Sequence, residues 1–239
     1  IDNDYAYPCF CDEKELEKYN IPCTKIPHFV STGYNAGNTT KEITESLNLS
    51  KPIPVFCGGP DFIVALIGTN TLSQGKVCDR AGSSEGINLC SKNPVFAPGF
   101  RTLPSVIPGL WNISVINNKS GILFAEYKKQ LESEFNKQIN YEDLFSDSIE
   151  DKNSQGFFIL SEILNNFTNS LDKLKKLAKE NDIPFSFFFS ITGGQAKNSK
   201  WVQLKAENSK TDISICNASD SELIGNAVIA LYGLGKFNS

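Results

Sequence analysis

The stretch that decides the fold runs from Phe56 to Cys90 and reads FCGGPDFIVALIGTNTLSQGKVCDRAGSSEGINLC. A short apolar strand, 53–56, precedes two glycines and a proline, and Asp61 then opens an apolar run, 62–67. Proline fits the first turn of a helix, and a carboxylate near the positive end of a helix is favoured in its ionised form. The pattern therefore predicts a strand, a glycine turn and a helix that presents Asp61 at its start, where a carboxylate can accept a proton.

A second glycine turn follows within the same stretch. Gly82, Ser83 and Ser84 separate two segments that are predicted to be the strands of a hairpin between Cys78 and Cys90. The N–H groups and hydroxyls of such a turn can hold an anion such as phosphate. Taken singly, an aspartate at a helix start is usually a cap and Gly-Ser-Ser is usually a plain turn. The order of the elements therefore carries the functional argument.

Further glycine loops occur later in the chain. An apolar strand, 185–192, runs into Gly193 and Gly194, and a helix with Trp201 follows. A buried strand, a glycine turn and a helix start form the usual geometry for a nucleotide at the edge of a sheet. Gly121 lies between a predicted strand and a predicted helix. From the sequence alone, a plain strand-to-helix loop is as well supported at this position as a functional loop.

Other segments are predicted from periodicity and composition. Helical spacing of apolar residues predicts a long helix over 157–181. The prolines of 93–108 indicate irregular structure, and the polar, acidic segment 136–153 is either a surface insertion or a cover over a helix.

In this order and spacing, the motifs resemble the C-terminal domain of the FGGY carbohydrate kinases, the family of xylulokinase, gluconate kinase and glycerol kinase. In that family a strand leads to Gly-Gly-x-Asp, to an apolar helix that ends in glycine, and to a Gly-Thr-Ser turn. The matching residues here are Gly58, Gly59, Asp61, Gly68, Gly82, Ser83 and Ser84. The segment from Gly193 resembles the family's adenosine-side motif, Gly-Gly-x-Ala-x-Ser, and the resemblance spans most of residues 21–235.

The resemblance implies an α/β fold, a ribonuclease-H-like domain of the actin and sugar-kinase ATPase class, with a mixed sheet and helices on both faces. The alternation of strands and helices favours the same class independently. The resemblance also implies two parts. Residues 1–52 would close an N-terminal sugar-kinase domain that is otherwise absent, and residues 53–239 would form the C-terminal ATP-binding domain.

The implied function is ATP-dependent phosphorylation of a sugar or polyol hydroxyl, as in xylulokinase, with Asp61 as the catalytic base. The implied ATP-binding residues are Gly82, Ser83, Ser84, Gly121, Gly193 and Gly194. Phosphoryl transfer also needs Mg²⁺, and the resemblance implies that the metal and most sugar contacts belong to the N-terminal domain. That domain's Asp-Gly-Thr motif is not found in this sequence, so we expect the isolated chain to be inactive.

Two other functions stay open. The family's Arg-Ala pair before Glu162 is missing, and Glu207 stands where the family has aspartate. These departures favour a non-catalytic nucleotide- or sugar-binding regulatory module on the same fold. A hydrolase built on Cys57 is disfavoured, because no His or Lys near it in sequence could activate the thiol. The single histidine, His28, is interpreted as structural, since no orienting partner is evident.

Composition sets the remaining expectations. The 239 residues carry a net charge of −4, so no attraction to nucleic acid or to an acidic membrane is expected, and no apolar run reaches the length of a membrane span. Cys9 and Cys11 lack a second ligand pair, so no metal site is predicted and the thiols are expected to be free in a reducing cytoplasm. The absence of methionine suggests a processed chain, an engineered one or a fragment, and the resemblance favours a fragment. A homodimer is compatible with the sequence.

Overall fold

The structure is a computed structural model that describes residues 18, 20, 22, 30–216 and 220–236. Cys9, Cys11 and His28 lie outside the described residues.

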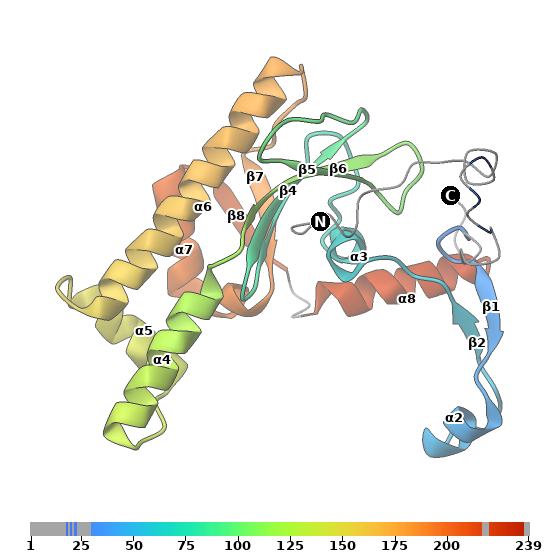
Figure 1. Cartoon of the computed structure of the whole chain (residues 1–239), viewed down its shortest axis with the longest axis horizontal. Helices are drawn as coiled ribbons and strands as arrows, with labels where there is room; N and C mark the ends of the chain where they lie inside the picture. The colour runs from blue at the N-terminus through green and yellow to red at the C-terminus, as the bar shows by residue number, and fades with distance from the viewer. Residues whose placement is uncertain (1–17, 19, 21, 23–29, 217–219, 237–239) are drawn as a thin grey trace.

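The centre of the fold is a six-stranded mixed sheet (Figure 1). In spatial order, its strands are β5 (Arg101–Pro104), β6 (Trp111–Asn117), β4 (Glu85–Ser91), β3 (Val77–Ala81), β7 (Phe188–Thr192) and β8 (Asp212–Ile215). β3 and β4 form the predicted antiparallel hairpin, whereas β3, β7 and β8 run parallel to one another. The predicted mixed sheet is therefore confirmed.

One prediction about the sheet is wrong. Residues 93–108 were expected to be irregular because of their prolines, but Arg101–Pro104 pairs with β6 as an edge strand. An edge strand tolerates proline because one of its sides needs no hydrogen-bonded neighbour. Pro104 stands at the last position of this edge strand, opposite Trp111.

Helices cover both faces of the sheet, as predicted (Figure 1). The helices α3 (Asp61–Gly68) and α8 (Ser221–Gly233) pack together on one face. The other face carries α6 (Gln155–Glu180) and α7 (Ser199–Ser209), with α4 (Gly121–Phe135) and α5 (Tyr141–Glu150) packed on α6. The short helix η2 (Gly194–Lys197) joins β7 to α7.

The two faces of β3 show how alternation builds two separate cores. Val77 packs with Phe167 and Leu171 of α6, whereas the next residue, Cys78, packs with Ile63 of α3. Successive side chains of a strand point to opposite faces, so neighbouring residues of β3 contact the two helix layers in turn. This alternation continues through Asp79 and Arg80 and decides where their charges lie.

The helix predictions agree closely with the structure. The long helix predicted over 157–181 is α6, which begins after Ser154, whose hydroxyl accepts a hydrogen bond from the Phe157 N–H. Serine at this position satisfies one of the free N–H groups of the first turn. Of the two alternatives for 136–153, the cover over a helix is confirmed, because Leu144 and Phe145 of α5 are buried against α6.

A smaller unit lies apart from the main sheet. The strands β1 (Asn35–Asn38) and β2 (Pro54–Phe56) form a two-stranded sheet, and α2 (Lys41–Ser46) lies between them in sequence (Figure 1). The predicted strand 53–56 is thus present, but it pairs with β1 and does not join the main sheet. The unit contacts the end of α8, where a Cβ on Gly233 would lie 2.4 Å from the Phe56 ring.

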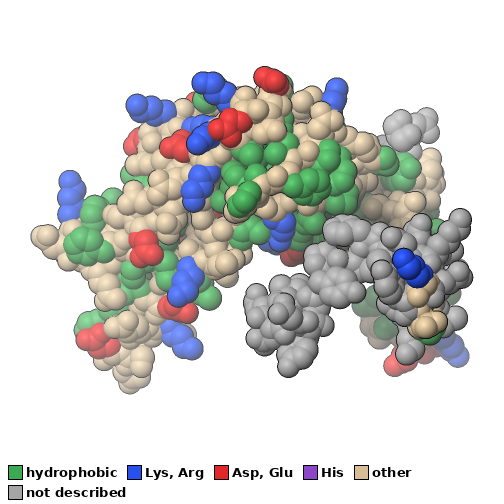
Figure 2. All heavy atoms as spheres, turned by 45° about the horizontal axis from the view of Figure 1, so that its top comes forward, with side chains coloured by type: hydrophobic (Ala, Val, Ile, Leu, Met, Phe, Trp, Pro, Cys, Tyr) green, Lys and Arg blue, Asp and Glu red, His purple; other side chains and the backbone are tan. Residues whose placement is uncertain are grey.

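Large apolar side chains also reach the surface, and Figure 2 shows hydrophobic side chains grouped on one face. Phe96 is 77 % exposed and Phe187 is 63 % exposed. Within the described residues, no helix combines the length and the apolar character that a membrane crossing requires.

Candidate nucleotide and phosphoryl-transfer site

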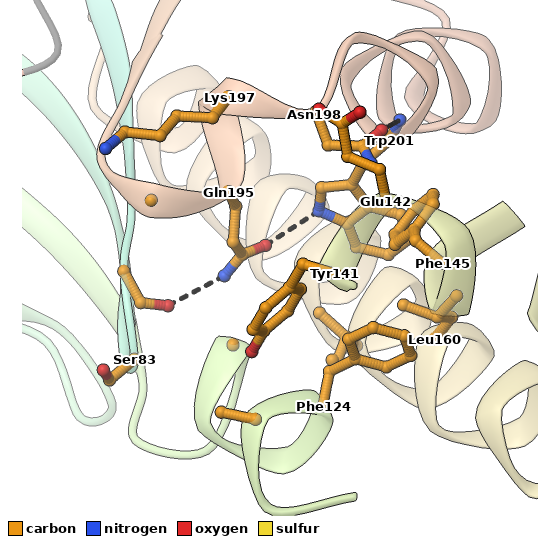
Figure 3. A pocket seen from close by; sticks show the side chains of 15 residues that line it. Ser83, Phe124, Tyr141, Glu142, Phe145, Leu160, Gln195, Lys197, Asn198 and Trp201 are labelled. Carbon is orange, nitrogen blue, oxygen red and sulfur yellow. Dashed lines mark hydrogen bonds between the residues drawn. The ribbon is translucent and has the colours of Figure 1, made fainter. Parts of the chain in front are cut away.

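A cavity of about 630 Å³ lies between the β3–β4 turn, η2 and the helices α4, α5, α6 and α7 (Figure 3). We call it the Gln195 cavity. Its lining residues are Gly82, Ser83, Gly121, Phe124, Ala125, Tyr141, Glu142, Phe145, Leu160, Ile163, Gly194, Gln195, Lys197, Asn198 and Trp201. Four of the six predicted ATP-binding residues therefore meet in one cavity, although up to 112 positions separate them in the sequence (Gly82 to Gly194).

The β3–β4 turn forms one wall of the cavity. The Gly82 N–H donates to the Ser84 carbonyl over 2.9 Å, which closes the turn. The Ser83 carbonyl accepts hydrogen bonds from the N–H groups of Ser120 and Ile122, at 3.2 Å and 3.1 Å. The turn is thus bonded to the start of α4. Ser84 is not among the residues that line the cavity.

Gly121 is required by close packing. A Cβ at this position would lie 2.5 Å from the Gly82 carbonyl oxygen, and the backbone of both segments would have to shift. The plain-loop interpretation of Gly121 therefore has a physical basis, since glycine lets the α4 start approach the turn. The same approach places Gly121 in the cavity wall.

Gly193 and Gly194 differ in what they need from glycine. Gly193 has φ = +95°, and a Cβ there would lie 2.6 Å from the Ala81 carbonyl oxygen, so glycine fits its backbone and its neighbour. A Cβ on Gly194 would meet nothing within 4 Å, and Gly194 lines the cavity. Gly193 is not a lining residue. Glycine at position 193 allows the loop to approach β3 closely, whereas glycine at position 194 leaves space in the cavity.

Gln195 joins the walls of the cavity (Figure 3). Its side-chain NH₂ donates to the Gly82 carbonyl and to the Ser120 hydroxyl, each at 2.9 Å. Its side-chain carbonyl accepts from the Trp201 indole N–H at 2.8 Å. The sequence motif around Gly193 contains Gln195, but its bridging role follows only from the three-dimensional arrangement.

The opposite wall is aromatic (Figure 3). Phe124 and Phe145 are in edge contact, with ring centroids 5.8 Å apart, and Trp201 lies 5.6 Å from Phe145. Tyr141 lies 5.9 Å from Phe124 and is 47 % exposed. Lys197 and Glu142 supply the charged groups of the lining, and Lys197 points away from the aromatic wall (Figure 3). An apolar wall with a few polar groups suits a flat heterocycle.

Asp61 lies outside this cavity, at the first position of α3. Its Oδ1 accepts the Phe62 N–H at 2.7 Å, and its Oδ2 accepts from Arg80 Nη2 at 2.9 Å. Arg80 also bonds Glu222 of α8, through Nε at 2.9 Å and Nη2 at 2.8 Å. The Asp61 side chain is 69 % exposed, so this carboxylate is accessible as well as paired. Arg80 stands two residues before Gly82, which places the Asp61 pair near the same end of β3 as the turn.

Two residues that mark departures from the family pattern, Glu207 and Glu162, lie outside the Gln195 cavity, whereas Ile163, which follows Glu162, lines it. Glu207 is exposed on α7, where its Oε1 accepts from the Gln203 side chain at 2.8 Å. Glu162 is exposed on α6. Neither residue is among those that line the cavity.

The described cysteines are free thiols, as predicted, and two of them are sealed in the core. Burial raises the pKa of the Cys78 thiol to about 12 and that of Cys90 to about 11. A thiolate is the reactive form, so neither group is suited to nucleophilic chemistry. Among the residues that the structure describes, no group of three or more His, Cys, Asp or Glu side chains is placed to hold a metal ion.

Comparisons with known proteins agree with this architecture. The described fold matches solved sugar kinases: a ligand-bound xylulose kinase from Lactobacillus acidophilus, with a TM-score of 0.75 at 15 % identity over 95 % of this chain, and a Plasmodium falciparum glycerol kinase with ADP, with a TM-score of 0.70 at 16 % identity over 99 %. The chain therefore has the fold of the sugar-kinase branch of the actin-like ATPases, as predicted.

A sequence relative points the same way. The xylulose kinase of Staphylococcus xylosus is 23 % identical to this chain over 257 aligned positions, which cover 94 % of the chain. The predicted resemblance to the carbohydrate kinases is thus confirmed, although no family model matches. The chain spans about half the length of these proteins: 53 % of the S. xylosus kinase and 52 % of the L. acidophilus kinase.

Proposed function

We propose that this chain is the nucleotide-side half of an ATP-dependent carbohydrate kinase, which phosphorylates a hydroxyl of a sugar or polyol of the xylulose type. The observation that carries the proposal is the Gln195 cavity, which joins a glycine-serine turn to an aromatic wall within the fold of the sugar kinases. The S. xylosus relative, a xylulose kinase, supports the choice of acceptor.

In this proposal each wall of the cavity takes one part of ATP. The adenine base lies against the aromatic wall beside Gly194, which has no side chain to obstruct it. The phosphates lie toward Gly82 and Ser83, where the turn offers N–H and hydroxyl donors, with Ser84 beside them. Gln195 fixes the distance between these two walls through its three hydrogen bonds.

Asp61 is the proposed base. Its exposed carboxylate, held by the Phe62 N–H and by Arg80, can accept the proton of the acceptor hydroxyl as that oxygen attacks the γ-phosphorus, while the bond from the γ-phosphorus to the bridging oxygen breaks and ADP leaves. Mg²⁺ would neutralise charge on the phosphates. We propose that its ligands are the nucleotide itself and groups of an N-terminal domain, for which residues 1–52 form the closing segment and which also holds the sugar. The proposed setting of the whole enzyme is the cytoplasm.

The nucleotide assignment is tested at Gly194. Gly194→Ala and Gly194→Val add side chains of increasing size to the cavity without meeting any protein atom within 4 Å at the Cβ. We expect an unchanged fold and an affinity for ADP that falls with side-chain size, because the added carbons occupy the space of the base. Calorimetry measures the affinity and circular dichroism the fold. Equal affinities in wild type and both variants would overturn the assignment.

The half-enzyme assignment is tested by activity. We expect no measurable phosphorylation of xylulose, glycerol or gluconate by this chain in a coupled assay, because transfer depends on a metal and an acceptor fixed in a closed cleft. Turnover of about 1–100 per second, the range of ordinary kinases, would show that the chain holds a complete site.

A regulatory module is the alternative, and Asp61→Asn in the full-length protein distinguishes it. A kinase would lose most of its turnover in the variant and retain ADP binding. A regulatory module would bind ADP in both forms and transfer phosphate in neither.

A further inference from the structure

Lys205 is a lysine with no exposed surface, and it does not line the Gln195 cavity but lies next to Trp201, which does. It projects from α7 into the core, where its Nζ donates to Asp79 Oδ2 at 2.8 Å and forms a second ion pair with Glu85 Oε1. The side chains of all three residues are 0 % exposed. We call these three residues the Lys205 cluster.

The two carboxylates of the cluster lie at the base of the β3–β4 turn. Asp79 is two residues before Ala81, the last residue of β3, and Glu85 is the first residue of β4. Ala81 and Glu85 are paired in register, so the turn 82–84 leaves the sheet directly above them. Lys205 therefore holds both strands at the point where the proposed phosphate turn begins.

The cluster extends toward the start of α4. The second oxygen of Glu85 accepts from the Asn117 side chain at 3.1 Å, and Asn117 accepts from the Ser170 hydroxyl of α6 at 2.9 Å. Asn117 ends β6, four residues before Gly121. Glu85 is thus bonded to the strand that leads into another wall of the cavity.

Lys205 is also tied to the aromatic wall. It lies four residues after Trp201 on α7, and its Nζ is 5.7 Å from the centre of the Trp201 ring. It is 4.6 Å from the centre of the Phe167 ring. One side chain therefore connects the helix that carries the Trp201 wall to the turn that faces it across the cavity.

Stability alone does not explain this cluster. Taking charges out of water is costly, and apolar replacements of a buried ion network are often as stable or more stable. The second oxygen of Asp79, Oδ1, is buried without a hydrogen-bond partner in the described part of the chain. Burial also raises the pKa of Asp79 to about 7, against the opposing effect of Lys205. What the cluster provides is a fixed geometry.

We propose that Lys205, through Asp79 and Glu85, is a positioning residue that sets the phosphate turn relative to the aromatic wall, so that one nucleotide engages both. This inference rests on the proposed nucleotide site. The contribution of the phosphates to nucleotide affinity then depends on Lys205, a side chain that does not line the cavity.

The test compares ADP with adenosine, which lacks phosphates. The variant Asp79→Leu/Glu85→Gln/Lys205→Met removes the three buried charges together. The amide oxygen that it places at position 85 can still accept the hydrogen bond that the Asn117 side chain donates in wild type. We expect its affinity for ADP to fall about tenfold, as the loss of one hydrogen bond to a charged group would cause, while its affinity for adenosine stays the same. Hydrogen–deuterium exchange should be faster in the peptide that spans 77–91.

Two further variants complete the experiment. Lys205→Arg keeps the charge but changes the reach and shape of the donor, so a folded protein with a lower ADP-to-adenosine affinity ratio is expected even where the triple variant does not fold. Lys176→Met removes a lysine whose side chain is 77 % exposed and which pairs with Glu180 on α6, and it should match wild type in both ligands.

The outcomes separate the two proposals. If the wild-type chain binds neither ADP nor adenosine, the nucleotide site and this inference both fail. If wild type binds both ligands, but the folded variants keep its affinity ratio and its exchange rate at the turn, only the inference fails. A purely structural role of Lys205 predicts equal losses of affinity for ADP and for adenosine. That result would also overturn the inference.

Discussion

Asp79 and Arg80 are neighbours on β3, and each belongs to a cluster of three charges on its own face of the sheet. Asp79 faces α7 and joins Glu85 and Lys205, where all three side chains are 0 % exposed. Arg80 faces α3 and α8 and joins Asp61 and Glu222, whose side chains are 69 % and 26 % exposed. The same strand thus carries a sealed ion cluster and an open one, one residue apart.

The difference follows from what covers each face. On the side of Asp79, Lys205 of α7 reaches the end of β3 and leaves the Asp79 side chain 0 % exposed. On the side of Arg80, α3 begins at this level, so the Asp61 carboxylate remains accessible at the helix start. This contrast supports the proposal that the chain supplies the nucleotide side of the site and that a further domain completes the acceptor side.

The largest effect is expected from breaking the sealed cluster on one side only. Lys205→Met leaves Asp79 and Glu85 facing each other in the core without a cation. Removal of one partner of a buried ion pair typically costs about 3–5 kcal/mol. We expect the free energy of unfolding, measured by urea denaturation, to fall by this amount at neutral pH.

The matched control is the triple variant without buried charge, Asp79→Leu/Glu85→Gln/Lys205→Met. It should recover much of the stability that Lys205→Met loses, since no uncompensated charge remains. If the single and triple variants were equally unstable, packing around Lys205 would be the cause and the electrostatic comparison would be wrong.

A smaller effect is expected in the pH dependence of stability. The pKa of Asp79 is raised from its ordinary value of 3.8 to about 7, chiefly by burial. Between these values the folded protein binds a proton that the unfolded chain has released. The contribution of Asp79 to stability is therefore full below about pH 4 and is lost as the pH rises through about 7.

Asp79→Asn should remove this dependence. We expect the unfolding free energy of the variant to change less than that of wild type between pH 4 and pH 7, when both are measured by urea denaturation at fixed ionic strength. Parallel curves for the two proteins would show that Asp79 does not take up the proton on folding.

The sequence predicted the framework of both clusters but not the clusters themselves. The order of strands, glycine turns and helices follows from local patterns, because turn residues and apolar periodicity act over short distances. The resemblance added the fold class, and four of the predicted residues do meet in the Gln195 cavity.

The pairings between distant elements were not predictable in the same way. Lys205 is 120 residues from Glu85. The local sequence of α7 is that of an ordinary helix and does not indicate that this lysine is buried. Gln195 follows the glycine pair directly, yet its contact with Gly82 spans 113 residues. Tyr141 and Phe145 are large apolar side chains in a polar segment, for which the sequence left a surface insertion and a cover over a helix open and did not indicate a cavity. Side chains that bridge elements depend on strand order and register, which local patterns do not specify.

The smallest effect is expected from the open cluster. Arg80→Ala removes the cation that holds Asp61 and Glu222, but the charges left behind remain in contact with water. Exposed ion pairs typically contribute about 0.2–1 kcal/mol, and we expect a loss of stability in this range. Asp61 keeps its hydrogen bond to the Phe62 N–H at 2.7 Å, so the start of α3 should survive the change.

Salt separates the two clusters further, since ions in solution screen exposed charges much more than buried ones. The loss caused by Arg80→Ala should shrink between low salt and ~1 M salt, at which the screening length is only ~3 Å, whereas the loss caused by Lys205→Met should persist. Urea denaturation of both variants at the two salt concentrations measures this. A salt-independent loss of several kcal/mol at Arg80 would contradict the description of its cluster as open. Such a loss would mean that the proposed base lies in a site as rigid as the sealed one, already formed before any acceptor domain closes over it.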